Sequence, residues 1–96
     1  MKKISASEQV EGWLLSLAPE PKRDVRAALR RLAAGQPVAT LALRRELDGF
    51  HRLRIGGWRV IYRVLPGRRI HLDYASSRDV VYDTFRHLLA LRPRED

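Results

Sequence analysis

The sequence predicts one α+β domain over residues 1–96, with the element order β-α-α-β-β-β-α: a small antiparallel sheet, an N-terminal helical hairpin and a C-terminal helix. Two segments with helical spacing of apolar residues, separated by prolines, predict the hairpin. A Gly-Gly pair between two strand-like runs predicts the centre of the sheet. A chain of 96 residues can bury one modest core.

Residues 2–6 are predicted to form a short edge strand. In the helix that follows, apolar residues at i, i+3, i+4 and i+7 form one stripe: Val10, Trp13, Leu14 and Leu17. Its N-terminal cap is either Ser5, which would form a capping box with Glu8, or Ser7. The segment Ala-Pro-Glu-Pro at 18–21 ends this helix, because proline disfavours helix in the residue before it.

A second helix is predicted to begin at Pro21 and to be capped at its C-terminus by Gly35. Its apolar residues repeat the stripe: Val25, Ala28, Leu29 and Leu32. The short link between the two helices predicts an antiparallel hairpin. Their outer faces carry basic residues, interpreted either as a solvated face or as part of an anion-binding surface: Lys22, Arg23, Arg26, Arg30 and Arg31.

The central hairpin lies in the run FHRLRIGGWRVIYRV, residues 50–64. Gly56 and Gly57 form the loop, because a two-residue turn of this kind needs positive φ, and Ile55 then lies opposite Trp58. Side chains alternate along a strand, so one face is apolar: Leu53, Ile55, Trp58, Val60, Tyr62 and Val64. The other face, here called the arginine face, carries Arg52, Arg54, Arg59 and Arg63.

Residues 36–49 are compatible with an extended connection or with a turn or two of helix. A third strand is predicted from the run LPGRRIHLDYA, residues 65–75. A three-residue loop at 66–68 directs three side chains into the core: Ile70, Leu72 and Tyr74. A two- or four-residue loop would bury Arg69, His71 and Asp73 instead, and burial of unpaired charge is costly. We therefore expect the three-residue loop, with His71 and Asp73 on the arginine face.

Ser76 and Ser77 are expected to cap a last helix, with Asp79 in its first turn. The apolar stripe of this helix consists of Val81, Phe85, Leu88 and Leu89. Arg78 and Tyr82 lie four residues apart on a neighbouring face. With the helices on one side of the sheet, the arginine face is expected to be uncovered.

The chain carries a net charge of +8, and 16 of its 19 basic residues are arginine. Such a charge favours polyanions, because each neutralised phosphate releases counterions. The planar guanidinium group suits phosphate oxygens and stacks on bases. We interpret this composition as nucleic-acid binding, with a solvated surface or an acidic protein partner as the alternatives.

Several classes of protein are disfavoured by the composition. No apolar run is long enough to cross a bilayer, and the start MKKISASEQ lacks the apolar centre of a signal peptide. The chain has no cysteine, and its histidines show no metal-ligand spacing: His51, His71 and His87. We expect a cytoplasmic protein without membrane contact, metal or cofactor.

Four stretches together resemble the RelE/ParE superfamily of bacterial toxins from toxin-antitoxin operons. They are Leu47-Asp48-Gly49, Arg52-Leu53-Arg54-Ile55-Gly56, Trp58-Arg59-Val60-Ile61-Tyr62 and Arg78-Asp79-Val80-Val81-Tyr82. The resemblance covers nearly the whole chain. It implies a small sheet with an αα-hairpin, a cytoplasmic location and a neutralising antitoxin encoded beside the toxin.

The RelE branch of this superfamily is favoured. Its members are mRNA interferases, endoribonucleases that inhibit translation by cleaving mRNA in the ribosomal A site with basic residues and a tyrosine. By motif position, the resemblance implies five catalytic residues: Arg52, Arg54, Arg59, Arg78 and Tyr82. Arg63 and His71 are expected to bind RNA. The implied partners are the antitoxin, mRNA and the ribosome, together with operator DNA for the toxin-antitoxin complex.

The sequence does not identify the general base, the group that accepts the proton of the attacking hydroxyl. RelE-type toxins have lysine where this chain has Arg54, and arginine stays protonated in proteins. His71, Asp73 and Tyr82 are the remaining candidates. Two other functions are compatible with the sequence: a ParE-like inhibitor of DNA gyrase without nuclease activity, and a degenerate member that binds only its antitoxin and operator DNA.

Overall fold

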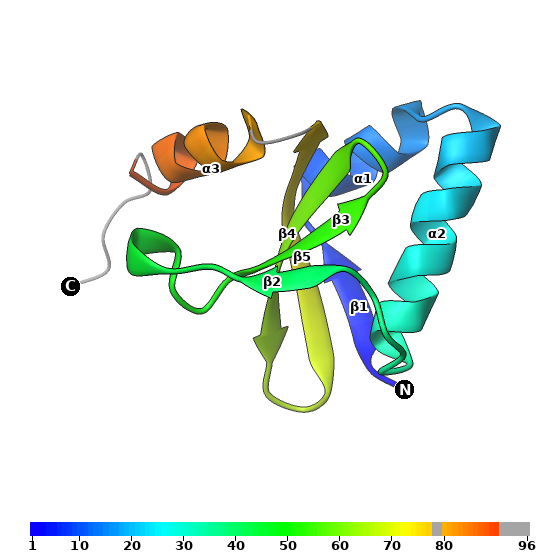
Figure 1. Ribbon diagram of the computed structural model, residues 1–96, viewed down its shortest axis with the longest axis horizontal. Helices are drawn as coiled ribbons and strands as arrows, with labels where there is room; N and C mark the ends of the chain where they lie inside the picture. Colours follow the sequence, from blue (N-terminus) through cyan, green and yellow to red (C-terminus); the bar gives the residue numbers. More distant parts are fainter. Residues whose placement is uncertain (78–79, 91–96) are drawn as a thin grey trace.

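The computed structural model of the protein describes residues 1–77 and 80–90. Over these residues the chain forms three helices, a short 3₁₀ turn and one five-stranded sheet of order β1-β5-β4-β3-β2 (Figure 1). The elements are β1 (Lys3–Ala6), α1 (Glu8–Ser16), α2 (Pro19–Ala33), β2 (Thr40–Ala42), the 3₁₀ turn (Arg45–Leu47), β3 (His51–Ile55), β4 (Trp58–Leu65), β5 (Arg69–Ser77) and α3 (Val80–Ala90).

The predicted α+β class is confirmed, but the expected antiparallel sheet is corrected in two respects. The ambiguous segment before the hairpin contains both an extended piece, β2, and the 3₁₀ turn. β1 runs parallel to β5, whereas the other neighbouring strands are antiparallel, so the sheet is mixed. None of the described helices is long and apolar enough to cross a membrane.

Both predicted helices form, with α1 packed against β5 and β1 and α2 against β3, and their caps decide between the alternatives. Ser7 caps α1, because its Oγ accepts a hydrogen bond from the Val10 N–H at 3.2 Å, while Ser5 lies in β1. α2 begins at Pro19 instead of Pro21, where the missing N–H costs nothing. Gly35 follows the last helical turn with φ of +73°, the left-handed conformation that ends helices most readily in glycine.

The register predicted for the central hairpin is confirmed. Ile55 lies opposite Trp58, and Arg54 lies opposite Arg59. The loop between β4 and β5 has three residues, with positive φ at Gly67 and Arg68, so Ile70 and Leu72 point into the core as expected.

The prediction for Tyr74 was wrong. Tyr62 pairs with Leu72, but Ile61 pairs with Tyr74, so Asp73 is an extra residue in β5. A bulge of one residue reverses the alternation beyond it. Tyr74 is therefore on the arginine face and packs there with the second cluster described below.

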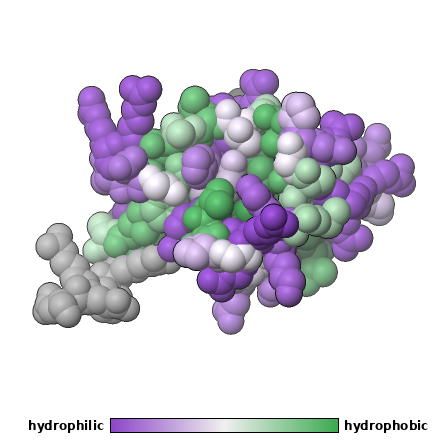
Figure 2. Space-filling view, turned by 90° about the horizontal axis from the view of Figure 1, so that it is seen from below, coloured by the Kyte–Doolittle hydropathy of each residue, from purple (hydrophilic) through white to green (hydrophobic). Residues whose placement is uncertain are grey.

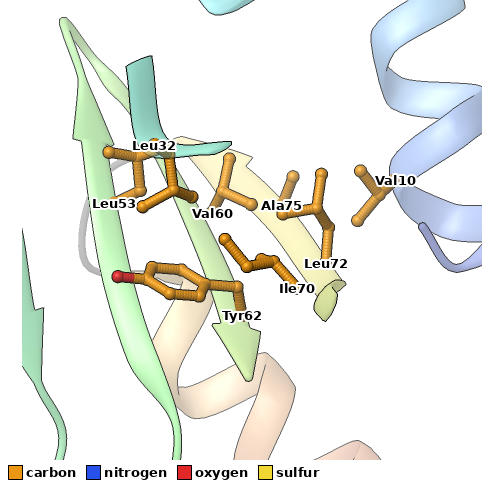
Figure 3. Packing of buried hydrophobic residues seen from close by; sticks show 8 residues of the cluster. All are labelled: Val10, Leu32, Leu53, Val60, Tyr62, Ile70, Leu72 and Ala75. Atoms are coloured by element: carbon orange, nitrogen blue, oxygen red, sulfur yellow. The ribbon is translucent and has the colours of Figure 1, made fainter. Parts of the chain in front are cut away.

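The main core lies between the sheet and the helices α1 and α2. Figure 3 shows its buried side chains: Val10, Leu32, Leu53, Val60, Tyr62, Ile70, Leu72 and Ala75. Trp13 of α1 meets Trp58 of β4 edge to face, with ring centroids 5.6 Å apart. The two tryptophans thus anchor the helical layer to the hairpin.

The arginine face is partly covered, contrary to expectation. α3 lies on the side of the sheet opposite α1 and α2 (Figure 1). Its Phe85 is buried with Leu47 and Ile61, in a second apolar cluster that Phe50 and Tyr74 border. The cause is Ile61, an apolar residue in the middle of the arginine face. Leu88, predicted to belong to the stripe, is 44% exposed.

The predicted start of the last helix is also corrected. Ser76 and Ser77 lie in β5, and the described part of α3 begins at Val80. Arg78 and Asp79 lie outside the described residues, as does the side chain of Val81.

Candidate active site

Three of the predicted site arginines come together because two neighbouring strands present them on one face. Arg52 and Arg54 lie on β3, and Arg59 lies on β4 directly opposite Arg54. Like charges placed opposite one another destabilise a strand pair. A bound anion would remove that repulsion, so this arrangement is suited to a phosphate group.

The fourth predicted residue, Tyr82, arrives from α3. Its hydroxyl accepts a hydrogen bond from Nη1 of Arg52 at 3.3 Å, across 30 residues of sequence. The ring of Tyr82 is half-buried at the border of the second apolar cluster. The position of α3 on the arginine face therefore brings an aromatic ring to the arginines.

Two guanidinium groups of the site each have one N–H donor without a hydrogen-bond partner among the described residues. Nη1 of Arg59 donates to the carbonyl oxygens of Gly56 and Trp58, each at 3.0 Å. The Nε atoms of Arg52 and Arg59 are buried, and neither has a hydrogen-bond partner among the described residues. A buried donor without a partner is costly, and an anionic oxygen is the partner that a guanidinium favours.

A second polar group lies farther along the same face. Arg63 binds Asp73 with both ends of its fork, Nε to Oδ2 at 3.0 Å and Nη2 to Oδ1 at 2.9 Å. His71 Nδ1 lies 2.8 Å from Ser5 Oγ, and its Nε2 lies 3.9 Å from Asp73 Oδ1. Arg63 follows Arg59 by four residues of strand, about 13 Å. The two groups are thus neighbouring but distinct sites.

Ser5 is the contact that sequence reasoning missed. The sequence places Ser5 in the strand at 2–6 or at a helix cap but does not identify its neighbour; in the structure β1 pairs with β5 and places Ser5 beside His71. The strand-like pattern of residues 2–6 is visible in the sequence, but its partner strand is not. Asp73, expected on the arginine face, pairs with Arg63 there.

Within residues 1–77 and 80–90, no three histidine, cysteine or acidic side chains are grouped in a way that could hold a metal ion. The arrangement around Arg52 and Arg59 offers fixed positive charge, directed donors and an aromatic ring. Chemically, it can bind a phosphate and stabilise the negative charge that develops on it during a displacement at phosphorus.

No protein-family model matches the sequence, and the comparison with curated proteins finds no match. Solved structures do share the fold. The archaeal RelE–RelB complex from Pyrococcus horikoshii matches 81% of this chain and 96% of its own, with a TM-score of 0.67 and 23% identity. The chain has the fold of RelE-type toxins.

Two further structures show how widely the RelE fold is shared. The intact RelBE toxin-antitoxin complex of Escherichia coli covers 82% of this chain and 99% of its own, with a TM-score of 0.65 and 12% identity. The YoeB–YefM toxin-antitoxin complex of Staphylococcus aureus covers 81% and 98%, with a TM-score of 0.66 and 15% identity. The RelE fold is thus matched over nearly the full length of each.

Proposed function

We propose that this chain is the toxin of a type II toxin-antitoxin system, an endoribonuclease that cleaves mRNA on the ribosome and so inhibits translation. The observation that supports it best is the group of Arg52, Arg54 and Arg59 on one sheet face, with Tyr82 bonded to Arg52, in a RelE-type fold. The identities with those structures are low, so this local chemistry carries the proposal.

The proposed reaction is attack of an RNA 2′-hydroxyl on the adjacent phosphorus. The bond from the 2′-oxygen to phosphorus forms, the bond from phosphorus to the 5′-oxygen breaks, and the 2′ proton leaves while the 5′-oxygen gains one. Negative charge grows on the phosphate oxygens in between, and Arg59 and Arg78 would stabilise it. No metal ion is required in this scheme, because fixed guanidinium groups supply the positive charge.

Tyr82 is proposed to stack on a base and hold the nucleotide in line for attack. For proton transfer the face offers His71, Asp73 and Tyr82. The Asp73 carboxylate is buried and both its oxygens accept from Arg63, whereas the Tyr82 hydroxyl touches an arginine of the site. Arg54 would hold the scissile phosphate without exchanging a proton.

The second polar group would bind RNA beyond the cleaved bond. His71 and Arg63 lie on the same face as Arg59, at a distance that a single strand crossing the face would span. Because Arg63 is already bound to Asp73, we assign the contact with phosphate mainly to its exposed edge and to His71.

The partners follow from the same proposal. RelE and YoeB are seen in complexes with RelB and YefM, and we propose a cognate antitoxin for this chain as well. A net charge of +8 would speed its association with an acidic antitoxin through electrostatic steering. Its targets would be mRNA and the ribosome, and the toxin-antitoxin complex would bind operator DNA. The protein would act in the cytoplasm.

The test is induced expression in a bacterial host, with primer extension on a reporter mRNA. Wild type is compared with Arg59→Ala and Arg78→Ala, and with Arg44→Ala as the matched control, an exposed arginine outside the strands. We expect cuts that require translation, that disappear in the first two variants and that persist in the control.

The other outcomes assign other functions. Wild-type cuts in Arg59→Ala would show that the arginine face is not the site. Growth arrest without cuts would indicate gyrase inhibition, and inhibition of DNA supercoiling by the purified protein would then identify it. Absence of growth arrest would indicate a member that only binds its antitoxin and operator DNA.

A further inference from the structure

A second basic surface lies on the opposite side of the molecule. Lys22, Arg26 and Arg30 follow one another at i and i+4 along α2, with Arg23 beside them, and span about 12 Å of helix. α2 packs on the sheet face that does not carry the site arginines (Figure 1). In Figure 2, hydrophilic side chains project on the side where Figure 1 places α2.

This surface extends past the end of the helix. The Lys2 N–H donates to the Ala33 carbonyl at 2.9 Å, which fixes the N-terminus beside α2, and Lys2 lines one depression with Arg26 and Arg30. The next depression is lined by Lys2 and Arg68. We call the continuous set the α2 basic track: Lys22, Arg23, Arg26, Arg30, Lys2 and Arg68.

The track contains no negative charge. Three adjoining depressions of about 370, 340 and 190 Å³ lie along it, and none is lined by an acidic residue. Lys22 donates to the Leu15 carbonyl, but no cation of the track has an ion-pair partner among the described residues. α2 has two acidic residues: Glu20, in its first turn, lines none of these depressions, and Asp24 borders a different one, together with Arg31 and Arg54.

This distribution is unfavourable for a helix that only needs to be soluble. Like charges at i and i+4 destabilise a helix, and surfaces that serve solubility intersperse the two signs. The cations of the track therefore repel one another, and a bound polyanion would reduce this repulsion. A polyanion would also gain from the release of its counterions.

The residues between the cations indicate which polyanion. Apolar atoms in the depressions come from aliphatic side chains such as Ile4, Leu29 and Ala33, and no aromatic ring lines any of the three. Unpaired bases bind by stacking on aromatic rings, whereas duplex RNA is recognised through its backbone and shape. The arginine face, with Tyr82 beside Arg52, has the opposite character.

We propose that the α2 basic track binds the phosphate backbone of double-stranded RNA, while the arginine face receives a single strand. The choice of RNA over DNA rests on the proposed function. The track would hold the protein on structured RNA from behind, leaving the arginine face free to act.

The test measures binding of a blunt, fully paired RNA duplex to the purified full-length chain, as a function of salt. Arg26→Gln/Arg30→Gln is compared with Arg44→Gln/Arg45→Gln, a matched control that removes two exposed positive charges outside both the track and the arginine face. We expect the track variant to lose about tenfold or more in affinity and to lower the salt slope by about 0.9 per contact removed. The control should bind the duplex about as wild type does. Thermal melting confirms that each variant is folded.

Four results would overturn the proposal: equal losses in both variants, which net charge alone explains; unchanged binding by the track variant; tighter binding of a DNA duplex of the same sequence; or track-dependent binding of polyglutamate that exceeds that of the duplex, which would assign the surface to an acidic protein. The assay needs no cleavage, so its result is independent of whether the chain is a nuclease.

Discussion

Arg63 and Asp73 form a two-pronged ion pair across β4 and β5, with N–O distances of 2.9 and 3.0 Å, at the bulge in β5. The Asp73 side chain is 3% exposed and that of Arg63 is 34% exposed. Arg63 therefore satisfies the buried carboxylate of Asp73. Among the described residues, no lysine and no other arginine forms an ion pair with that carboxylate.

We expect Arg63→Gln to lower the free energy of unfolding by about 2–3 kcal/mol, because it leaves the buried Asp73 carboxylate without its positive partner. The loss is moderate because solvent partly screens Arg63 in the wild type. Asp73→Asn should cost less, since the arginine left behind can turn to water. Urea denaturation of both variants measures this order. Equal stability of Arg63→Gln and wild type would contradict it.

The two roles available to Tyr82 separate in a pair of variants. Tyr82→Phe keeps the ring and loses only the hydrogen bond from Arg52, so we expect most of the cleavage rate to remain. Tyr82→Ala removes the stacking surface and should lower the rate about 10- to 100-fold. Single-turnover cleavage on programmed ribosomes measures both. If Tyr82→Phe falls to the level of Tyr82→Ala, the hydroxyl transfers the proton.

Phe85 links the stability of α3 to the site. Its ring is 3% exposed and meets Phe50 edge to face, with centroids 5.0 Å apart. Phe85→Ala should destabilise the protein by about 3–4 kcal/mol. It should also reduce cleavage in the fraction that stays folded, because Tyr82 depends on the position of α3. Phe85→Leu, which keeps most of the volume, is the control and should retain both properties.

Tyr62 predicts how stability changes at alkaline pH. Burial raises the pKa of its phenol above the ordinary 10.0, while a hydrogen bond with the Thr40 side chain acts in the opposite direction. The unfolded chain therefore ionises first as pH rises. The contribution of Tyr62 is complete below pH 10.0 and is lost between that value and the raised pKa of the folded state. Tyr62→Phe should flatten this decline in a series of denaturation curves, and an unchanged decline would refute the assignment.

The hairpin and its arginines could be predicted from sequence because their information is local. Gly56 and Gly57 fix the turn, the turn fixes the register, and strict alternation then places Arg52 and Arg59 on one face. The bulge could not be predicted, because nothing in the local residue pattern of β5 marks Asp73 as unpaired. Asp73 is held there by its contact with Arg63, on the neighbouring strand.

The side of the sheet on which α3 packs could not be predicted from the apolar pattern. Phe85 identifies an apolar stripe, but the stripe does not say which side of the sheet it covers. That choice is made by Ile61 and by the phase change at Tyr74, which together create an apolar area between the arginines. The contact between Tyr82 and Arg52 follows from it.

The parallel pairing of β1 with β5 has a consequence for how the chain folds. Ser5, Ser7 and Gln9 each form a side-chain hydrogen bond with β5, and each bond joins residues 66 positions apart. Contacts of such high sequence separation form slowly, since a long loop must close before they are made. During synthesis, the N-terminal strand and helices must wait until β5 has left the ribosome before the core can close. The core that supports the arginine face thus closes only after Ser77, the last residue of β5, has been synthesised.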